Sequence, residues 1–314
     1  MKKSDISVVI PIYNEQDSLL ELYERLTKSL SNFTDNYDII FVNDGSSDNS
    51  LEIMLGLSEK DKHVYYINFS RNFGHQIALS AGLEYCHSET TVLMDGDLQD
   101  PPELIEKLYS KYKEGFDVVY AKRQKREGET WVKKFTAKVF YRLFKRMIPF
   151  EIPLDTGDFR LISQKVVKSL NKMTERSKFL RGQIAWLGFN HAEVLFDREP
   201  RKHGEIKYSY SKLTKLALDG ITGFSDKPLI MVSRLGFIIS IFSFLVIIYA
   251  IFSHFVLKHS ITGWTSLIIS SAFIGGIQLL SIGVIGEYIN RINNNTRERP
   301  LFIVKDTNIK SDED

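Results

Sequence analysis

The chain has 314 residues, with 41 Lys and Arg against 39 Asp and Glu, and a formal net charge of +2. This balance lacks the strongly basic character of nucleic-acid-binding proteins, so we expect no nucleic-acid partner. A single cysteine excludes an intramolecular disulfide framework and any zinc site built from several cysteines.

The first 120 residues alternate short apolar runs with segments of helical spacing. Strands are predicted at 6–12, 37–42, 64–69, 91–94 and 116–121, and helices at 18–30, 50–57, 77–85 and 101–112. Fully apolar strands that alternate with helices are typical of a mostly parallel sheet covered on both faces. The predicted fold class is therefore α/β.

Polar side chains follow the predicted strands at the points where they end. They are Tyr13, Asn14, Glu15, Asp44, Arg71, Asp95, Asp97, Gln99 and Arg123. In open parallel sheets, ligands bind beyond the carboxyl ends of the strands, so these positions predict a polar ligand there. The glycine patterns of dinucleotide-binding and P-loop proteins are absent, which argues against both classes.

The stretch "LMDGDLQDPP" follows the fourth predicted strand and contains Asp95 and Asp97. Carboxylates are hard oxygen ligands that suit Mg²⁺ or Mn²⁺. A D-x-D pattern alone is more often a solvated turn, but its place at a strand end favours the metal site. Asp44, in "VNDGSSD", either forms a turn or accepts a hydrogen bond from a base or ribose.

A second polar cluster, "LDTGDFRLIS", has Asp155 and Asp158 on either side of Gly157. One of these carboxylates could act as a base or orient an acceptor. The alternative is a loop that caps a helix.

The C-terminal third is apolar in two long runs. Residues 235–257 and 260–286 contain no Lys, Arg, Asp or Glu, and each exceeds the roughly 20 residues that cross a bilayer. The flanking basic residues place both ends in the cytoplasm. The preceding amphipathic segment, 208–224, is either an interfacial helix or a helix packed on the domain.

We therefore expect a catalytic domain at 1–207, juxtamembrane helices at 208–230, a transmembrane hairpin at 231–290 and a cytoplasmic tail at 291–314, frayed from Lys305.

Seven motifs occur in order: "VVIPIYNEQ", "VNDGSSD", "RNFGHQIALSAGL", "MDGDLQDPPE", "DTGDFRL", "FLRGQIAWLGF" and "RKHGEIKYSYSKL". Together they resemble the family 2 glycosyltransferases of the GT-A fold. More narrowly, they are similar to the polyprenyl-phosphate glycosyltransferases, such as bactoprenol glucosyltransferases and dolichol-phosphate mannose synthases. The resemblance covers residues 5–300, including both apolar runs. One departure is Ile206, where family members often have a small hydroxyl residue.

The resemblance implies a role for each matching position. Nucleotide-sugar binding is implied for Pro11, Tyr13, Glu15, Asp44 and Asp95. Metal binding is implied for Asp95, Asp97 and Gln99. Catalytic roles are implied for Asp97 and Asp158, and lipid-phosphate binding for Arg123, Lys134 and Arg201.

The implied reaction transfers a sugar from a nucleotide sugar to a polyprenyl phosphate in the membrane, with inversion and with Mg²⁺ or Mn²⁺. UDP-glucose and undecaprenyl phosphate are our first expectations, although no motif fixes the sugar. The implied location is the cytoplasmic membrane, and a homo-oligomer is compatible with the family. Three alternatives remain: a processive polysaccharide synthase, which would have a Q-x-x-R-W motif, a membrane-tethered transferase with a glycan acceptor, and a non-catalytic scaffold.

Overall fold

The computed structural model describes residues 4–124, 147–148, 150–151, 153, 156–197, 222–255 and 263–309. The chain divides into two units. The first comprises Met1–Tyr141, Phe150–Leu213 and Arg299–Asp314, and the second comprises Arg142–Pro149 and Thr214–Glu298.

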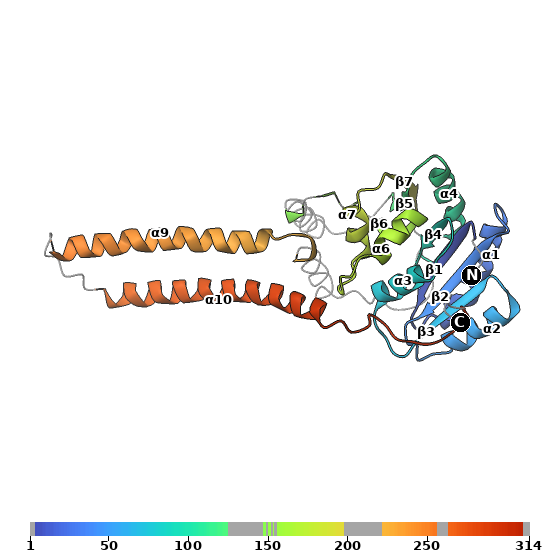
Figure 1. The fold of residues 1–314 in the computed structure, drawn as a ribbon, viewed down its shortest axis with the longest axis horizontal. Coiled ribbons are helices and arrows are strands. Elements are labelled where there is room, and N and C mark those ends of the chain that lie inside the picture. The colour runs from blue at the N-terminus through green and yellow to red at the C-terminus, as the bar shows by residue number, and fades with distance from the viewer. Residues whose placement is uncertain are drawn as a thin grey trace. The chain divides into compact units, whose positions relative to one another are not determined.

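The first unit is built on a mixed sheet, which in the described residues has eight strands in the order β7-β5-β6-β4-β1-β2-β3-β8 (Figure 1). The strands are β1 (Ile6–Ile12), β2 (Tyr37–Asn43), β3 (Val64–Phe69), β4 (Thr90–Leu93), β5 (Val118–Arg123), β6 (Thr156–Ser163), β7 (His191–Phe196) and β8 (Val304–Thr307). Neighbours among β1 to β4 pair in parallel, as do β5 and β7, whereas β6 and β8 run antiparallel to their neighbours. The expected α/β class, with a mostly parallel sheet, is confirmed.

Helices cover both faces of this sheet. They are α1 (Gln16–Ser31), α2 (Ser50–Lys60), α3 (His75–Glu84), η1 (Pro102–Leu104), α4 (Ile105–Lys113), α6 (Gln164–Asn171) and α7 (Leu180–Trp186). The strands and helices predicted in the first 120 residues all form, with bounds shifted by a few residues.

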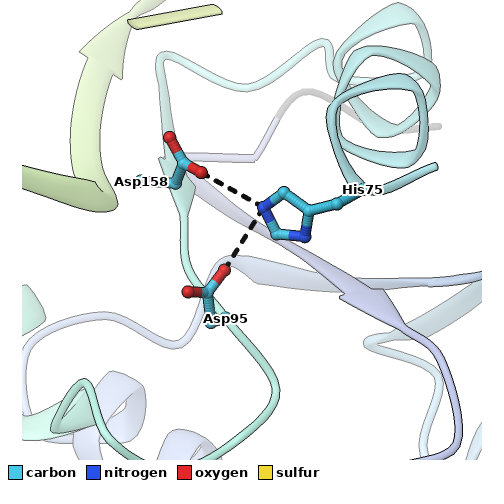
Figure 2. A group of neighbouring side chains, drawn as sticks. All are labelled: His75, Asp95 and Asp158. Atoms are coloured by element: carbon cyan, nitrogen blue, oxygen red, sulfur yellow. Dashed lines mark hydrogen bonds and ion pairs between the residues drawn. The ribbon is translucent and has the colours of Figure 1, made fainter. Parts of the chain in front are cut away.

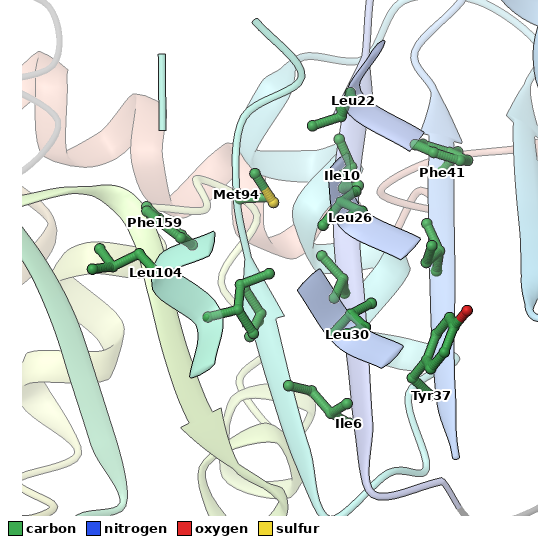
Figure 3. Close-up of a cluster of buried hydrophobic side chains, with 14 of the residues drawn as sticks. Ile6, Ile10, Leu22, Leu26, Leu30, Tyr37, Phe41, Met94, Leu104 and Phe159 are labelled. Carbon is green, nitrogen blue, oxygen red and sulfur yellow. The ribbon is translucent and has the colours of Figure 1, made fainter. Parts of the chain in front are cut away.

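The core has two layers because successive strand residues face opposite sides. Ile10 of β1 joins the cluster that contains Leu22 and Leu26 of α1, as Figure 3 shows. Val9 joins the opposite cluster, which includes Leu79 of α3. The helical period of α1 follows from this contact, since Leu19, Leu22, Leu26 and Leu30 recur every three or four positions and are fully buried.

Strand β6 was not expected from its sequence. Its residues Phe159 and Leu161 belong to one core cluster and Ile162 to the other, so both faces of the strand are buried. Arg160 is also fully buried, with its guanidinium 5.2 Å from the ring centroid of Tyr120. The polar residues that precede Phe159 are therefore fixed by a central strand rather than carried on a free loop.

The expectation of a frayed tail from Lys305 is wrong for the described residues. Residues 304–307 form β8, which pairs with β3, and Ile309 is buried against the sheet. Polar side chains of the tail, such as Asp306, hydrogen-bond to polar groups of β3, including Asn68.

The second unit contains two long apolar helices, α9 (Lys227–Phe255) and α10 (Trp264–Thr296). Lys227–Val246 and Phe273–Thr296 are long and apolar enough to cross a membrane, with mean hydropathies of 2.3 and 1.3. At their polar ends, Tyr288 donates a hydrogen bond to the Ser225 carbonyl at 2.7 Å. Most of the predicted amphipathic segment, residues 208–221, lies outside the described residues.

Candidate active site

The candidate site lies where β1, β2 and β4 end, because these strands are parallel neighbours whose carboxyl ends share one edge. Strand β6 reaches the same edge from the opposite direction. It is antiparallel to β4, with Leu93 opposite Arg160. Asp95, which follows β4, is therefore brought beside Asp158, which precedes Arg160.

Three side chains meet at this edge: His75, from the start of α3, with Asp95 and Asp158 (Figure 2). The His75 Nε2 atom lies 3.4 Å from Asp95 Oδ1 and 3.2 Å from Asp158 Oδ2. One ligand atom from each residue lies within 4.8 Å of the other two, so the group could hold a metal ion.

The Asp158 carboxylate is contacted on both oxygens. Gln76 Nε2 donates to Oδ2 at 3.0 Å, and the Nη2 atoms of Arg160 and Arg181 lie 3.5 and 3.6 Å from Oδ1. Burial raises the pKa of Asp158, but the His75 hydrogen bond and the charges of the two arginines outweigh burial and hold that pKa well below its usual range. Asp158 is therefore ionised near neutral pH, and a carboxylate with so low a pKa is a weak base.

His75 is the cationic partner of these carboxylates. Burial lowers the pKa of His75, but the hydrogen bond with Asp158 and the negative charges of Asp95, Asp158 and Asp44 raise it to about 9. The side chain is 43% exposed, so water weakens each of these charge interactions. At pH 7 a positively charged imidazolium thus lies between Asp95 and Asp158.

The predicted metal ligands lie on the turn after β4. Asp97 Oδ1 accepts a hydrogen bond from the Gln99 N–H at 3.1 Å, and Leu98 between them has a φ of 57°. The side-chain oxygens of Asp95, Asp97 and Gln99 are of the hard type that fits Mg²⁺ or Mn²⁺. Among the described His, Cys, Asp and Glu side chains, however, the group close enough to share an ion joins Asp95 to His75 and Asp158, without Asp97.

The residues predicted to bind the nucleotide follow β1 and β2. Pro11 is buried in β1, whereas Tyr13, just beyond the strand, is 41% exposed. Glu15 is half-buried, and its backbone N–H donates to Ser50 Oγ at 3.0 Å. This hydrogen bond connects the turn after β1 to the start of α2.

Asp44 is almost fully buried after β2, and its carboxylate contacts the loop that follows β3. Oδ1 accepts the Phe73 N–H at 2.6 Å, and Oδ2 accepts the Gly74 N–H at 3.0 Å. Burial raises the pKa of Asp44, and these two hydrogen bonds oppose that effect only in part. Gly45, at a φ of +69°, lets the two loops touch, since a Cβ there would lie 2.6 Å from the Arg71 backbone. Asp44 therefore shapes the loop that carries His75, besides any contact with a ligand.

Of the residues predicted to bind the lipid phosphate, Arg123 ends β5 beside Gly157. Its Nη2 atom is 3.5 Å from the position that a Cβ would take on Gly157. The guanidinium thus lies next to the backbone that leads into Asp158. Lys134, Arg201 and Asp155 lie outside the described residues.

Comparison with known proteins identifies the family of this chain. Residues 7–170 match the model of glycosyl transferase family 2. The chain belongs to this family. The transferase is 46% identical to an uncharacterised glycosyltransferase of Synechocystis sp. over 96% of this chain and 95% of that protein. It is 37% identical to the bactoprenol glucosyl transferase of Shigella phage SfV, over 96% of this chain and 98% of that protein.

Among solved structures, the transferase is similar to glucosyl-3-phosphoglycerate synthase from Mycobacterium tuberculosis, at a TM-score of 0.48 and 18% identity. That match covers 70% of this chain and 78% of the other.

Sequence reasoning did not assign four residues of this site: His75, Gln76, Arg160 and Arg181. All four contact Asp158, and each lies within a motif quoted above, in "RNFGHQIALSAGL", "DTGDFRL" or "FLRGQIAWLGF". The available signal was the position of His75 shortly after β3, at the same edge as the acidic residues. The site therefore combines carboxylates, which together with His75 could hold a metal ion, with the cationic side chains of Arg160 and Arg181.

Proposed function

We propose that this enzyme transfers a hexose from a UDP-sugar, first of all UDP-glucose, to undecaprenyl phosphate or a related polyprenyl phosphate, with inversion at the anomeric carbon. The observation that carries the proposal is the similarity to a bactoprenol glucosyl transferase along almost the full length of both chains, including both apolar helices. The cluster of carboxylates and cations at the sheet edge supports it.

The nucleotide sugar has a diphosphate leaving group, which needs positive charge as the bond to the sugar breaks. A bound Mg²⁺ or Mn²⁺ would supply that charge, and Asp95, Asp97 and Gln99 would hold it. Pro11 in β1, together with Tyr13, Glu15 and Asp44 on the turns after β1 and β2, would line the nucleotide half of the donor site. Arg123 would bind the acceptor phosphate, together with Lys134 and Arg201.

Asp158 would orient the acceptor rather than deprotonate it. A phosphate monoester has a second pKa of about 6, so it is mostly a dianion at pH 7 and needs little help from a base. The contacts with His75, Arg160 and Arg181 keep Asp158 ionised and fixed in direction. We therefore expect Asp158→Asn to reduce turnover less than Asp97→Asn.

The pairing of β8 with β3 supports a proposed membrane arrangement. Because β8 comes after α10 and joins the same sheet as β1 to β7, the chain must return to the side from which it left. Two crossings by α9 and α10 satisfy this requirement. We propose that the sheet and both chain ends lie in the cytoplasm, where nucleotide sugars are made, and that the lipid acceptor is presented at the membrane surface.

The test is transfer from radiolabelled UDP- and GDP-sugars to undecaprenyl phosphate, in detergent with Mg²⁺ or Mn²⁺. EDTA and Asp97→Asn should abolish the product. Glu114→Gln should leave it unchanged, because it removes only an exposed carboxylate at the end of α4 that pairs with Lys111. A chloroform-soluble labelled product from one donor would identify the sugar.

Absence of a lipid product with every donor, from folded protein and intact lipid, would refute the polyprenyl acceptor. Transfer to an added glycan under the same conditions would instead support a membrane-tethered glycan transferase. A protein that neither hydrolyses nor transfers any donor would be a scaffold.

A further inference from the structure

The segment after the second apolar helix is built into the catalytic sheet. Strand β8 pairs with β3, and the Ser70 N–H extends the pairing by donating to the Ile303 carbonyl at 3.0 Å. Beyond the strand, Asn308 accepts the Tyr66 N–H at 2.9 Å. Residues 303–308 are therefore held along β3 by backbone and side-chain hydrogen bonds.

A chain of buried amides runs inward from β8. Asp306 Oδ1 accepts a hydrogen bond from Asn68 Nδ2 at 2.6 Å, and Asn68 Oδ1 accepts one from Asn43 Nδ2 at 2.9 Å. Asn43 Oδ1 then accepts the Ser46 N–H at 3.1 Å. Asn43 and Asn68 are only 2% and 4% exposed, so water is largely excluded from this chain.

The direction of this chain is set by its outer end. Asp306 Oδ1 is the acceptor of this hydrogen bond, so the nitrogen of the Asn68 amide faces it. The Asn68 oxygen must then face Asn43, and the Asn43 oxygen must face Ser46. A flip of one amide would put two donors or two acceptors together in a buried place, which costs more than losing an exposed contact.

The inner end of the chain is the loop after β2. Ser46 Oγ accepts the Asn14 N–H at 3.0 Å, and the Ser47 N–H donates to Asn14 Oδ1 at 2.8 Å. These bonds join the loop after β2 to the turn after β1, where the proposed nucleotide contacts Tyr13 and Glu15 lie. The orientation of the Asn43 amide therefore affects the loop after β2 and, through that loop, the turn after β1.

A series of aromatic ring contacts leads from the tail to the same region. Phe302 stacks on Phe69, with ring centroids 5.2 Å apart, and Phe69 meets Phe73 edge-on at 5.5 Å. The backbone N–H of Phe73 is the one that donates to Asp44. Phe302 is thus connected through Phe69 to the loop that the Asp44 carboxylate holds.

We propose that Asp306 and Phe302, which follow the membrane helices in the chain, are positioning residues for the nucleotide half of the donor site. The proposal rests on the proposed function, because it takes the turns after β1 and β2 as the nucleotide site. Neither residue touches the substrate: Asp306 sets the amide orientations that place the Ser46 loop, and Phe302 supports the loop at Phe73.

The test measures UDP affinity by titration calorimetry on the full-length protein in detergent, with Mn²⁺. Asp306→Ala should weaken UDP binding about tenfold, as expected when one buried amide loses its partner. It should raise the KM for the donor and leave kcat within about twofold, since the reacting atoms are untouched. Asp306→Asn keeps an accepting oxygen and should restore most of the affinity.

Thr307→Val is the matched control on the same strand. It removes the hydrogen bond from Thr307 Oγ1 to the Tyr66 carbonyl, which is 2.6 Å long but does not lead into the nucleotide loops. It should lower the unfolding temperature as Asp306→Ala does, with UDP affinity kept within about twofold. Phe302→Ala should weaken UDP binding and Phe302→Tyr should not, because tyrosine keeps the stacked ring.

Wild-type affinity in Asp306→Ala and Phe302→Ala would overturn the proposal, and so would equal losses of affinity in Thr307→Val. Both results would leave the proposed function intact, because wild-type binding would still be present. Wild-type protein that binds no UDP would instead remove the UDP-sugar donor, and this inference with it.

Discussion

Replacement of Asp158 by asparagine should destabilise the catalytic unit strongly at neutral pH. The carboxylate is only 15% exposed and faces Arg160, whose side chain is 1% exposed. Removing one member of a buried ion pair costs about 3–5 kcal/mol, because the other charge stays buried. Arg160 keeps its hydrogen bond to the Gly157 carbonyl at 2.6 Å, so we expect the lower end, about 3 kcal/mol.

For a unit of this size, about 3 kcal/mol corresponds to a fall in Tm of about 6–12 °C. The measurement is thermal unfolding followed by circular dichroism, in detergent with EDTA. Asp97→Asn is the matched control, because an asparagine oxygen can still accept the Gln99 N–H, and its Tm should change by no more than about 2 °C.

The pH dependence of this difference gives a second check. The folded-state pKa of Asp158 lies well below its usual range, so its stabilisation is present above the unfolded pKa of about 4 and is lost as the pH falls through the folded value. The gap between wild type and Asp158→Asn should hold at pH 5–7 and narrow only below about pH 4. A gap of less than about 2 °C at pH 7 would refute the conclusion that Asp158 neutralises the buried Arg160.

Two further predictions concern single titratable groups. The pKa of His75 is raised from 6.5 to about 9, so its stabilising charge is fully present below pH 6.5 and is lost as the pH rises through 9. The Tm of the metal-free wild-type protein should therefore fall over that pH range. An equal fall in the Tm of His75→Gln would contradict this prediction. Burial raises the pKa of Cys86 to about 12, so the folded protein should not react with Ellman's reagent at pH 8. One thiol should appear in guanidinium, and rapid labelling of native protein would show that Cys86 is accessible.

The sequence predicted the parts of the fold that depend on local pattern. β1 and β3 have the predicted bounds, because each is a mostly apolar run with polar residues on both sides. β6 was missed because its sequence, with Asp158 at the start and Arg160 in the middle, is too polar for a central strand. Its burial depends on the pairing with β4 and β5, which are distant in the chain.

Two carboxylates of the cluster, Asp95 and Asp158, were named from the sequence, and the cations around Asp158 were not. Asp95 belongs to a D-x-D pattern in a single segment, whereas His75, Arg160 and Arg181 come from α3, β6 and α7 and meet only around Asp158. A single histidine at a helix start carries no spacing signal. Its role is defined by carboxylates that the fold brings from other strands.

The late position of β8 in the chain affects how the enzyme is made. The ribosome must produce both apolar helices before residues 304–307 emerge, and until then β3 is an open edge strand with unpaired backbone groups. Such edges pair with other chains, so fragments that stop within α9 or α10 should aggregate. Synthesis of both apolar helices therefore precedes completion of the catalytic sheet, and a chain released before α10 is finished would lack the strand that covers the β3 edge.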